Sequence, residues 1–262
     1  MVNMKNLRVI LRYSVNSFQQ TLSNLPVFFI FLFSKIVRYA LFGIFIFTLF
    51  SQVSPAAGFT GIQMLMFYLI FNLIDTTSQL LYREVYRFRP LVVSGGFDLV
   101  LTKPFPPLLR VLLGGPDLMD LGMLLIIISL LVYISGTFIH PSLDQTLIFF
   151  LLFINSLALA TAFHIFVLGI GIITLSVDHL VMIYRDLTSL VRIPVDFFTD
   201  SLRFLLTFII PVGIMFTFPA KALMGLLSWP LVVLSLLIST AVLSLSFFFW
   251  RYSLRFYQSA SS

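Results

Sequence analysis

The chain has 262 residues, of which 60% are hydrophobic and 10% are charged, and its mean hydropathy is +1.07. Soluble domains average about 25% charged residues, so a water-soluble fold is excluded. The net charge of +6 could indicate a nucleic-acid ligand, but in a membrane protein the distribution of the charges is more informative than their sum. No cysteine is present, which excludes disulfides, thiolate metal sites and cysteine nucleophiles.

The first predicted element is an amphipathic helix. Apolar residues recur at spacings of three and four from Leu7 to Leu25, and Lys5, Arg8 and Arg12 fall on the opposite face. This pattern is typical of a helix that lies in the plane of the membrane interface.

The apolar stretch that follows contains two cations, Lys35 and Arg38. A charge at the bilayer centre costs about 2.5–3.5 kcal/mol, so the least costly arrangement lets both side chains reach the cytoplasmic interface. We therefore expect the interfacial helix to cover residues 5–34 and the first span to begin near Ile36.

Six apolar stretches approach the ~20 residues that a helix needs to cross a bilayer. The predicted spans are residues 36–58, 59–81, 116–139, 147–176, 204–218 and 230–250. The fifth is short and contains Pro211, and Pro219 follows it. A helix broken there would leave Ala220–Trp229 as an outer re-entrant element. The predicted fold is an all-α polytopic membrane protein with six transmembrane helices and an N-terminal in-plane helix.

The basic residues are distributed asymmetrically about these spans. With the amino terminus in the cytoplasm, the outer loops hold Lys221 alone, and the inner side holds thirteen cations: Lys5, Arg8, Arg12, Arg83, Arg87, Arg89, Lys103, Arg110, Arg185, Arg192, Arg203, Arg251 and Arg255. Such a bias indicates that both termini are cytoplasmic. It also accounts for the basic charge without nucleic acid.

Two connections on the inner side, residues 82–115 and 177–203, are more than solvated loops. In the first, charged residues alternate with aromatic ones, and Gly95-Gly96 permits a tight turn. This composition suits short helices that form a docking surface beneath the membrane. The second alternates charged and apolar residues.

The sequence contains no motif of the common soluble enzymes. There is no Walker A loop, no His-Glu-x-x-His and no Gly-x-Ser-x-Gly. Asp117 and Asp120 open the third span, where a helix N-terminus favours carboxylates. A membrane-embedded lipid-modifying enzyme would need Asp117, Asp120 or His140, and these face opposite sides of the membrane.

Polar residues inside the spans are few. Asp75 and Gln79 are expected to form a structural hydrogen bond, and His164 to bond to a neighbouring helix. A secondary carrier or channel remains an alternative, but these spans lack the charges of a proton- or sodium-coupled carrier. Any energy for transport would therefore enter from a partner.

Three segments resemble a known family. The first is Val93–Pro104, with the pattern Gly-Phe-Asp-Leu before Lys103-Pro104. The second is Ile193–Asp196 with Phe208–Gly213 and Phe218–Gly225, and the third is the tail Arg255–Ser262. In order and spacing, from about Arg8 to the C-terminus, the chain resembles the six-span permeases of ABC-2-type transporters. Gly96-Phe97 departs from the pattern, since many relatives carry a charged residue before the aspartate.

The resemblance implies a permease that pairs with an identical or homologous permease above two ABC ATPase subunits. ATP and Mg would bind to the ATPase, with no cofactor on this chain. The cargo would be amphipathic, lipid-like or drug-like, exported from the cytoplasm of a prokaryote along a path lined by spans two and five. The residues expected to couple to the ATPase are Arg87, Arg89, Gly95, Gly96, Asp98, Lys103 and Pro104, with Tyr184, Arg185 and Asp186 as lesser contacts.

Overall fold

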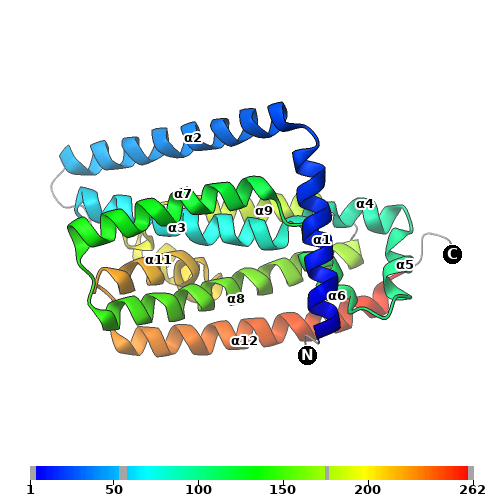
Figure 1. Cartoon of the computed structure of the whole chain (residues 1–262). Coiled ribbons are helices and arrows are strands. Elements are labelled where there is room, and N and C mark those ends of the chain that lie inside the picture. The colour runs from blue at the N-terminus through cyan, green and yellow to red at the C-terminus, as the bar shows by residue number, and fades with distance from the viewer. Residues whose placement is uncertain (1–3, 53–57, 175–176, 259–262) are drawn as a thin grey trace.

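The protein is a bundle of long helices. A computed structural model describes residues 4–52, 58–174 and 177–258, and the described residues form helices and no β-strand, which confirms the all-α prediction. Five helical stretches are long and apolar enough to cross a membrane. They contain α2 (Leu25–Gln52), α3 (Gly61–Tyr82), α7 (Leu118–Ile134), α8 (Leu143–Thr174) and α12 (Trp229–Ser253), which run side by side in Figure 1.

The two ends of the bundle differ in structure. One end, called here the α1 end, carries α1 (Met4–Leu22), η1 (Arg83–Arg87), α4 (Phe88–Val93), α5 (Gly96–Leu101), α6 (Pro107–Leu113) and the C-terminal η5 (Leu254–Phe256). Helix α1 runs across the long helices at this end (Figure 1). The opposite end, called the turn end, carries the connections from α2 to α3, from α7 to α8 and from α11 (Val212–Leu223) to α12.

Local sequence explains where three of the long helices begin. Thr60 and Gln63 form a reciprocal capping box at the start of α3. Asp117 accepts a hydrogen bond from the backbone N–H of Met119 at the start of α7. Ser142 and Gln145 exchange side-chain and backbone hydrogen bonds at the start of α8.

The junction between the first two helices differs from the prediction. Helix α1 ends at Leu22 and α2 runs without interruption from Leu25, so no break occurs near Ser34. Pro26 explains the position, because proline suits the first turn of a helix and cannot continue the preceding one. Lys35 therefore lies inside α2, where a partner rather than the membrane interface neutralises it.

Helix α8 is the central element, and it contacts α3, α9 (Val177–Leu190), α11 and α12. Gly169 permits the close approach of α12, since a Cβ atom there would lie 2.7 Å from the Phe249 ring. His164 bonds to Ala160 O of its own helix at 2.7 Å, not to a neighbouring helix as expected. Its ring lies between those of Tyr82 and Tyr184, with both centroids at 4.7 Å, in a tilted and an edge-to-face arrangement respectively.

The connection 177–203 is not confined to the α1 end. Near its start, Asp178 pairs with Arg89 of α4. Further along, Tyr184 packs on His164 of α8, and the Arg192 guanidinium lies 5.9 Å from the Phe42 ring of α2. The segment thus advances along the bundle from the α1 end.

Phe197 marks the end of this passage. Its ring contacts Phe50 and Phe59 at 5.4 and 6.1 Å, on either side of the turn between α2 and α3. Residues 177–197 therefore make the fifth crossing, which sequence analysis assigned to Phe204–Phe218. Hydropathy missed it because α9 is short and amphipathic.

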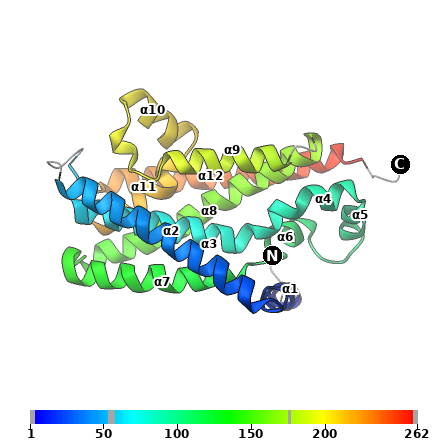
Figure 2. The same cartoon turned by 90° about the horizontal axis from the view of Figure 1, so that it is seen from above.

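The predicted fifth span is instead part of a re-entrant element. Two helical segments, Asp200–Ile209 (α10, Asp200–Phe204, with η4, Leu205–Ile209) and α11, meet at 97°. Pro211 lies at the bend. Lys221 Nζ contacts Asp196 Oδ1 at 2.8 Å, although the two residues were expected on opposite sides of the membrane. The re-entrant element thus covers 200–223 rather than Ala220–Trp229, and α10 projects from the bundle in Figure 2.

This arrangement revises the charge distribution. Arg203 joins Lys221 near the turn end, and Arg185 and Arg192 lie along the bundle with Lys35 and Arg38. The α1 end keeps ten of the sixteen Lys and Arg residues: Lys5, Arg8, Arg12, Arg83, Arg87, Arg89, Lys103, Arg110, Arg251 and Arg255. The asymmetry persists. Residues 53–57 of the first turn, 175–176 of the fourth predicted span and 259–262 of the tail motif lie outside the described residues.

The assignment of the fifth crossing predicts a labelling pattern. The chain has no cysteine, so each introduced thiol is unique. In sealed vesicles, a membrane-impermeant maleimide should label Asp200→Cys and Asp144→Cys from the same side, and Lys103→Cys only from the other side. All three positions are exposed. Labelling of Asp200→Cys together with Lys103→Cys would contradict the crossing at 177–197.

Candidate functional site

Helices α4 and α5 form a compact pair that projects from the α1 end (Figure 1). Between them Gly95 adopts φ 73°, a left-handed conformation that glycine accepts without strain. Four apolar side chains on the inner faces are buried, namely Phe88, Val92, Phe97 and Val100. The rings of Phe88 and Phe97 meet edge to face at 5.2 Å, which fixes the two short helices against each other.

The outer faces of the same pair are apolar and exposed. Leu99 is 65% exposed, Val93 58% and Leu101 37%. Lys103 and Pro104 are also exposed just after α5. An apolar patch bordered by polar residues at the end of a membrane bundle, outside the spans, is a candidate surface for a protein partner.

The C-terminal segment supports α5. Tyr257 donates a hydrogen bond to Asp98 Oδ1 at 2.8 Å, and its ring packs on Phe97 at 5.1 Å. Burial and the hydrogen bond to Asp98 raise the pKa of Tyr257 to about 12, so the phenol stays protonated and remains a donor at physiological pH. Asp98 thus holds α5 against the C-terminal segment.

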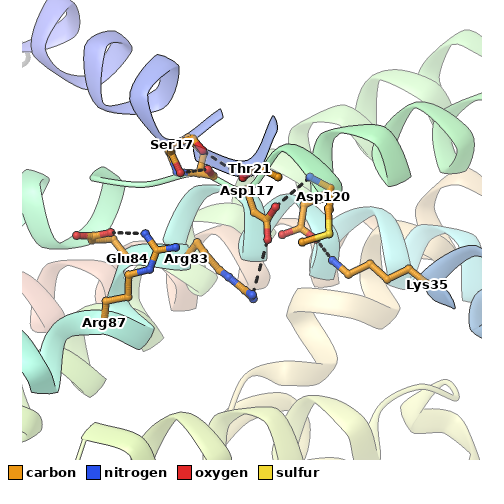
Figure 3. A network of polar contacts seen from close by, with 10 residues as sticks. Ser17, Thr21, Lys35, Arg83, Glu84, Arg87, Asp117 and Asp120 are labelled. Atoms are coloured by element: carbon orange, nitrogen blue, oxygen red, sulfur yellow. Dashed lines mark hydrogen bonds and ion pairs between the residues drawn. The ribbon is translucent and has the colours of Figure 1, made fainter. Parts of the chain in front are cut away.

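A polar network, called here the anchor, joins η1, α2, α6 and α7, and Figure 3 shows most of it. Its charged members are Lys35, Arg83, Glu84, Arg87, Arg110, Asp117 and Asp120. Glu84 binds Arg110 at 2.6 Å and Arg87 at 3.5 Å, which ties η1 to α6. Gly115 is needed at this point, because a Cβ atom there would lie 2.7 Å from Glu84 Oε2. Arg110 also lies over the Tyr13 ring of α1 at 4.5 Å.

The anchor continues to α2 and α7 (Figure 3). Lys35 Nζ lies 2.5 Å from Asp120 Oδ1, and Arg83 lies 3.7 Å from Asp117 Oδ2. Ser17 donates to Pro116 O at 2.7 Å, which attaches α1. The predicted role of Asp117 and Asp120 at a helix N-terminus is confirmed, and both are far from His140, which ends η2 (Ser135–Ile139) near the turn end.

The structure separates the predicted coupling residues into two groups. Arg87 belongs to the anchor, and Arg89 pairs with Asp178 at 3.3 Å, which joins α4 to α9. Tyr184, in contrast, is buried against Phe163 and His164 of α8. Arg185 lines a cleft between helices, and Asp186 lies one residue further along α9. These three residues do not join the surface of α4 and α5.

Sequence analysis missed the residues that hold the site in place, namely Lys35, Glu84, Asp120 and Tyr257. One sequence signal could have identified the Lys35–Asp120 pair. Each residue is a charge in an apolar stretch, and an intramembrane charge usually has a partner of opposite sign. In the described part of the chain, no cluster of three or more His, Asp or Glu residues could hold a metal ion.

The Lys35–Asp120 and Arg89–Asp178 ion pairs should differ in how much stability is lost when each is broken. Asp120 is 2% exposed in its side chain, so Lys35→Met leaves a buried, unpaired carboxylate and should cost about 3–5 kcal/mol of stability. Arg89→Met breaks a pair whose side chains are 52% and 56% exposed and should cost less than about 1 kcal/mol. Thermal unfolding of the purified protein in detergent measures both.

The double variant Lys35→Met with Asp120→Leu is the control, because it removes both charges together. It should recover most of the stability that Lys35→Met loses. Equal melting temperatures for Lys35→Met and Arg89→Met would contradict a structural role for the Lys35–Asp120 pair.

Comparison with known proteins agrees with this architecture. The family model described as ABC-2 family transporter protein matches residues 36–261, which include α3 to α12 and leave α1 outside. No curated protein and no solved structure matches the chain significantly. Because the matched region covers most of the chain and the fold is an all-α bundle of apolar helices, this multi-pass membrane protein belongs to the ABC-2 transporter family and is a transport component, not itself an enzyme.

Proposed function

We propose that this chain is the permease subunit of an ATP-driven exporter, in which two permease subunits, identical or homologous, assemble with two ABC ATPase subunits. The observation that carries the proposal is the exposed apolar surface of α4 and α5, held on a charged anchor at the basic end of a transporter of the ABC-2 family. This surface lies outside the spans, where a soluble partner could reach it.

The charge distribution supports the orientation. Ten of the sixteen cations lie at the α1 end, and cytoplasmic loops carry an excess of Lys and Arg. The α1 end, the docking surface and both termini are therefore assigned to the cytoplasm of a prokaryote, with the chain in its cytoplasmic membrane. The ATPase would bind from that side.

The energy would come from the partner. The sequence has no Walker A loop, so ATP and Mg bind on the ATPase chains, and their binding can shift the permease only through different affinities for its two states. A displacement of α4 and α5 would be transmitted to α3, which is continuous with α4 through η1. It would be transmitted to α9 through the Arg89–Asp178 ion pair. Because α9 belongs to the fifth crossing, a displacement at the docking surface would tilt this crossing.

The export path would run between the two permease subunits. Sequence analysis assigned its lining to spans two and five, but α3 is enclosed by α2, α7, α8 and α11. Helix α2 has two buried residues, Gly43 and Ile46, and exposes a broad apolar face. We therefore assign the lining to α2 and the fifth crossing, and this composition suits an amphipathic cargo.

The first experiment isolates the complex. The tagged chain is purified from gently solubilised native membranes, and the proteins that co-purify are identified by mass spectrometry. The expected partner is a soluble chain with a Walker A loop. If no ATPase appears even after crosslinking, the proposed function is wrong.

The docking surface yields a sharper prediction. Leu99→Glu places a charge on the apolar tip of α5 and should lower the yield of co-purified ATPase at least tenfold, which corresponds to about 1.4 kcal/mol of binding free energy. Leu143→Glu is the matched control, because Leu143 is 74% exposed at the turn end. An unchanged ATPase yield with Leu99→Glu would exclude this surface as the contact.

A further inference from the structure

A polar cleft opens to the surface of the bundle between α2, α3 and α9. Its volume is about 190 Å³, and three arginines from two helices and the segment after α9 line it: Arg38, Arg185 and Arg192. Arg38 is in the middle of α2, and Arg192 lies over Phe42 one turn further along α2. The cleft thus extends from the middle of α2 to the α1 end, where Tyr86 of η1 also lines it.

The positive charge of the cleft is not neutralised by the chain. Within the described residues, no carboxylate lies within 4.0 Å of any of the three guanidinium groups. Asp75 is the one carboxylate that lines the cleft among these residues, and it accepts a hydrogen bond from Gln79 at 2.7 Å. The charged groups that line it leave a formal excess of two positive charges.

Such an excess is costly in a membrane. Each arginine at the bilayer centre costs about 2.5–3.5 kcal/mol, and ionisable residues at this depth usually mark a binding site or a path. The aromatic contacts of Arg38 with Tyr39 and of Arg192 with Phe42, at 5.3 and 5.9 Å, hold the cations in place but add no negative charge. The cleft therefore has a chemical requirement for an anion.

A second cavity adjoins the cleft. It has a volume of about 300 Å³, lies between α2, α3 and α7, and is lined almost entirely by apolar side chains such as Ile44, Phe47 and Leu130. Tyr39, Tyr68 and Asn72 line both cavities. A ligand with a charged head and a hydrocarbon tail could thus occupy the two at once.

We propose that the paired cavities bind an anionic amphiphile, with a phosphate, sulfate or carboxylate head among Arg38, Arg185 and Arg192 and an apolar chain between α2, α3 and α7. As the cargo class of the exporter, this ligand deepens the proposed function and rests on it. Binding itself does not require the ATPase, so the two ideas fail separately.

The binding test uses the purified chain in a neutral detergent, without ATPase. Native mass spectrometry follows its titration with phosphatidylglycerol or with phosphatidylcholine of the same acyl chains. One phosphatidylglycerol per chain should bind at least tenfold more tightly than phosphatidylcholine, because only its net negative charge complements the arginines.

Variants assign the bound lipid to this site. Arg38→Gln and Arg192→Gln should each weaken phosphatidylglycerol binding about tenfold. Asp75→Asn should tighten it several-fold, because it removes the one carboxylate of the cleft, and loss of a merely structural contact would not have this effect. Arg251→Gln, an exposed position on α12, is the matched control and should leave binding unchanged. Thermal unfolding verifies that each variant is folded.

Equal affinities for the two lipids, or phosphatidylglycerol binding that Arg38→Gln and Arg192→Gln do not weaken, would overturn the proposal. So would loss of permease pairing in these variants with lipid binding intact, since the arginines would then face a second copy of the chain.

A second experiment distinguishes a transported cargo from a lipid that stays bound. In the purified complex, phosphatidylglycerol should stimulate ATP hydrolysis, and Arg192→Gln should abolish the stimulation. Binding without stimulation would overturn the assignment as cargo.

Discussion

The neutralisation of charge inside an apolar bundle is the constraint on which the rest of this structure depends. Lys35 lies in an uninterrupted α2 because the buried carboxylate of Asp120 is 2.5 Å away. Glu84 holds η1 and α6 together through Arg87 and Arg110. Removal of one partner from such a pair leaves a charge that neither lipid nor protein solvates, so the position of each helix in the anchor is determined by its neighbours.

The three arginines of the polar cleft are the exception to this pairing. Asp120 and Glu84 have cations in contact, whereas Arg38, Arg185 and Arg192 surround a space. The charged residues of this chain therefore have two different roles. Paired charges in the anchor build a rigid support, and the arginines of the cleft, which have no carboxylate in contact among the described residues, create a requirement for an anion.

Helix α9 connects the proposed docking surface to this cleft. Its first turn contacts α4 through Asp178 and Arg89, and its later residues carry Arg185 toward the cleft. A displacement of α4 and α5 by a partner would therefore act on the element that presents the cations. This spatial continuity makes α9 the helix in which energetic coupling between the two sites would be measured.

The sequence was sufficient for several features that depend on local composition. It predicted the all-α membrane class, the amphipathic character of α1, the carboxylates at the start of α7, the turn at Gly95-Gly96 and the family. These features follow from hydropathy, helix periodicity and capping, which are properties of neighbouring residues.

Only the tertiary structure decided which segments cross the bundle and which charges meet. Hydropathy assigned a span to Phe204–Phe218, which forms part of a re-entrant element. It missed α9, because a short helix that packs only one face on α4, α8 and η1 need not be apolar throughout. Hydropathy also placed Lys35 at the membrane interface. This prediction was wrong because the cost of an intramembrane cation depends on its partner, and the partner of Lys35 is Asp120, 85 residues away. Crossing and pairing are properties of contacts between distant segments, and these contacts have no local signature.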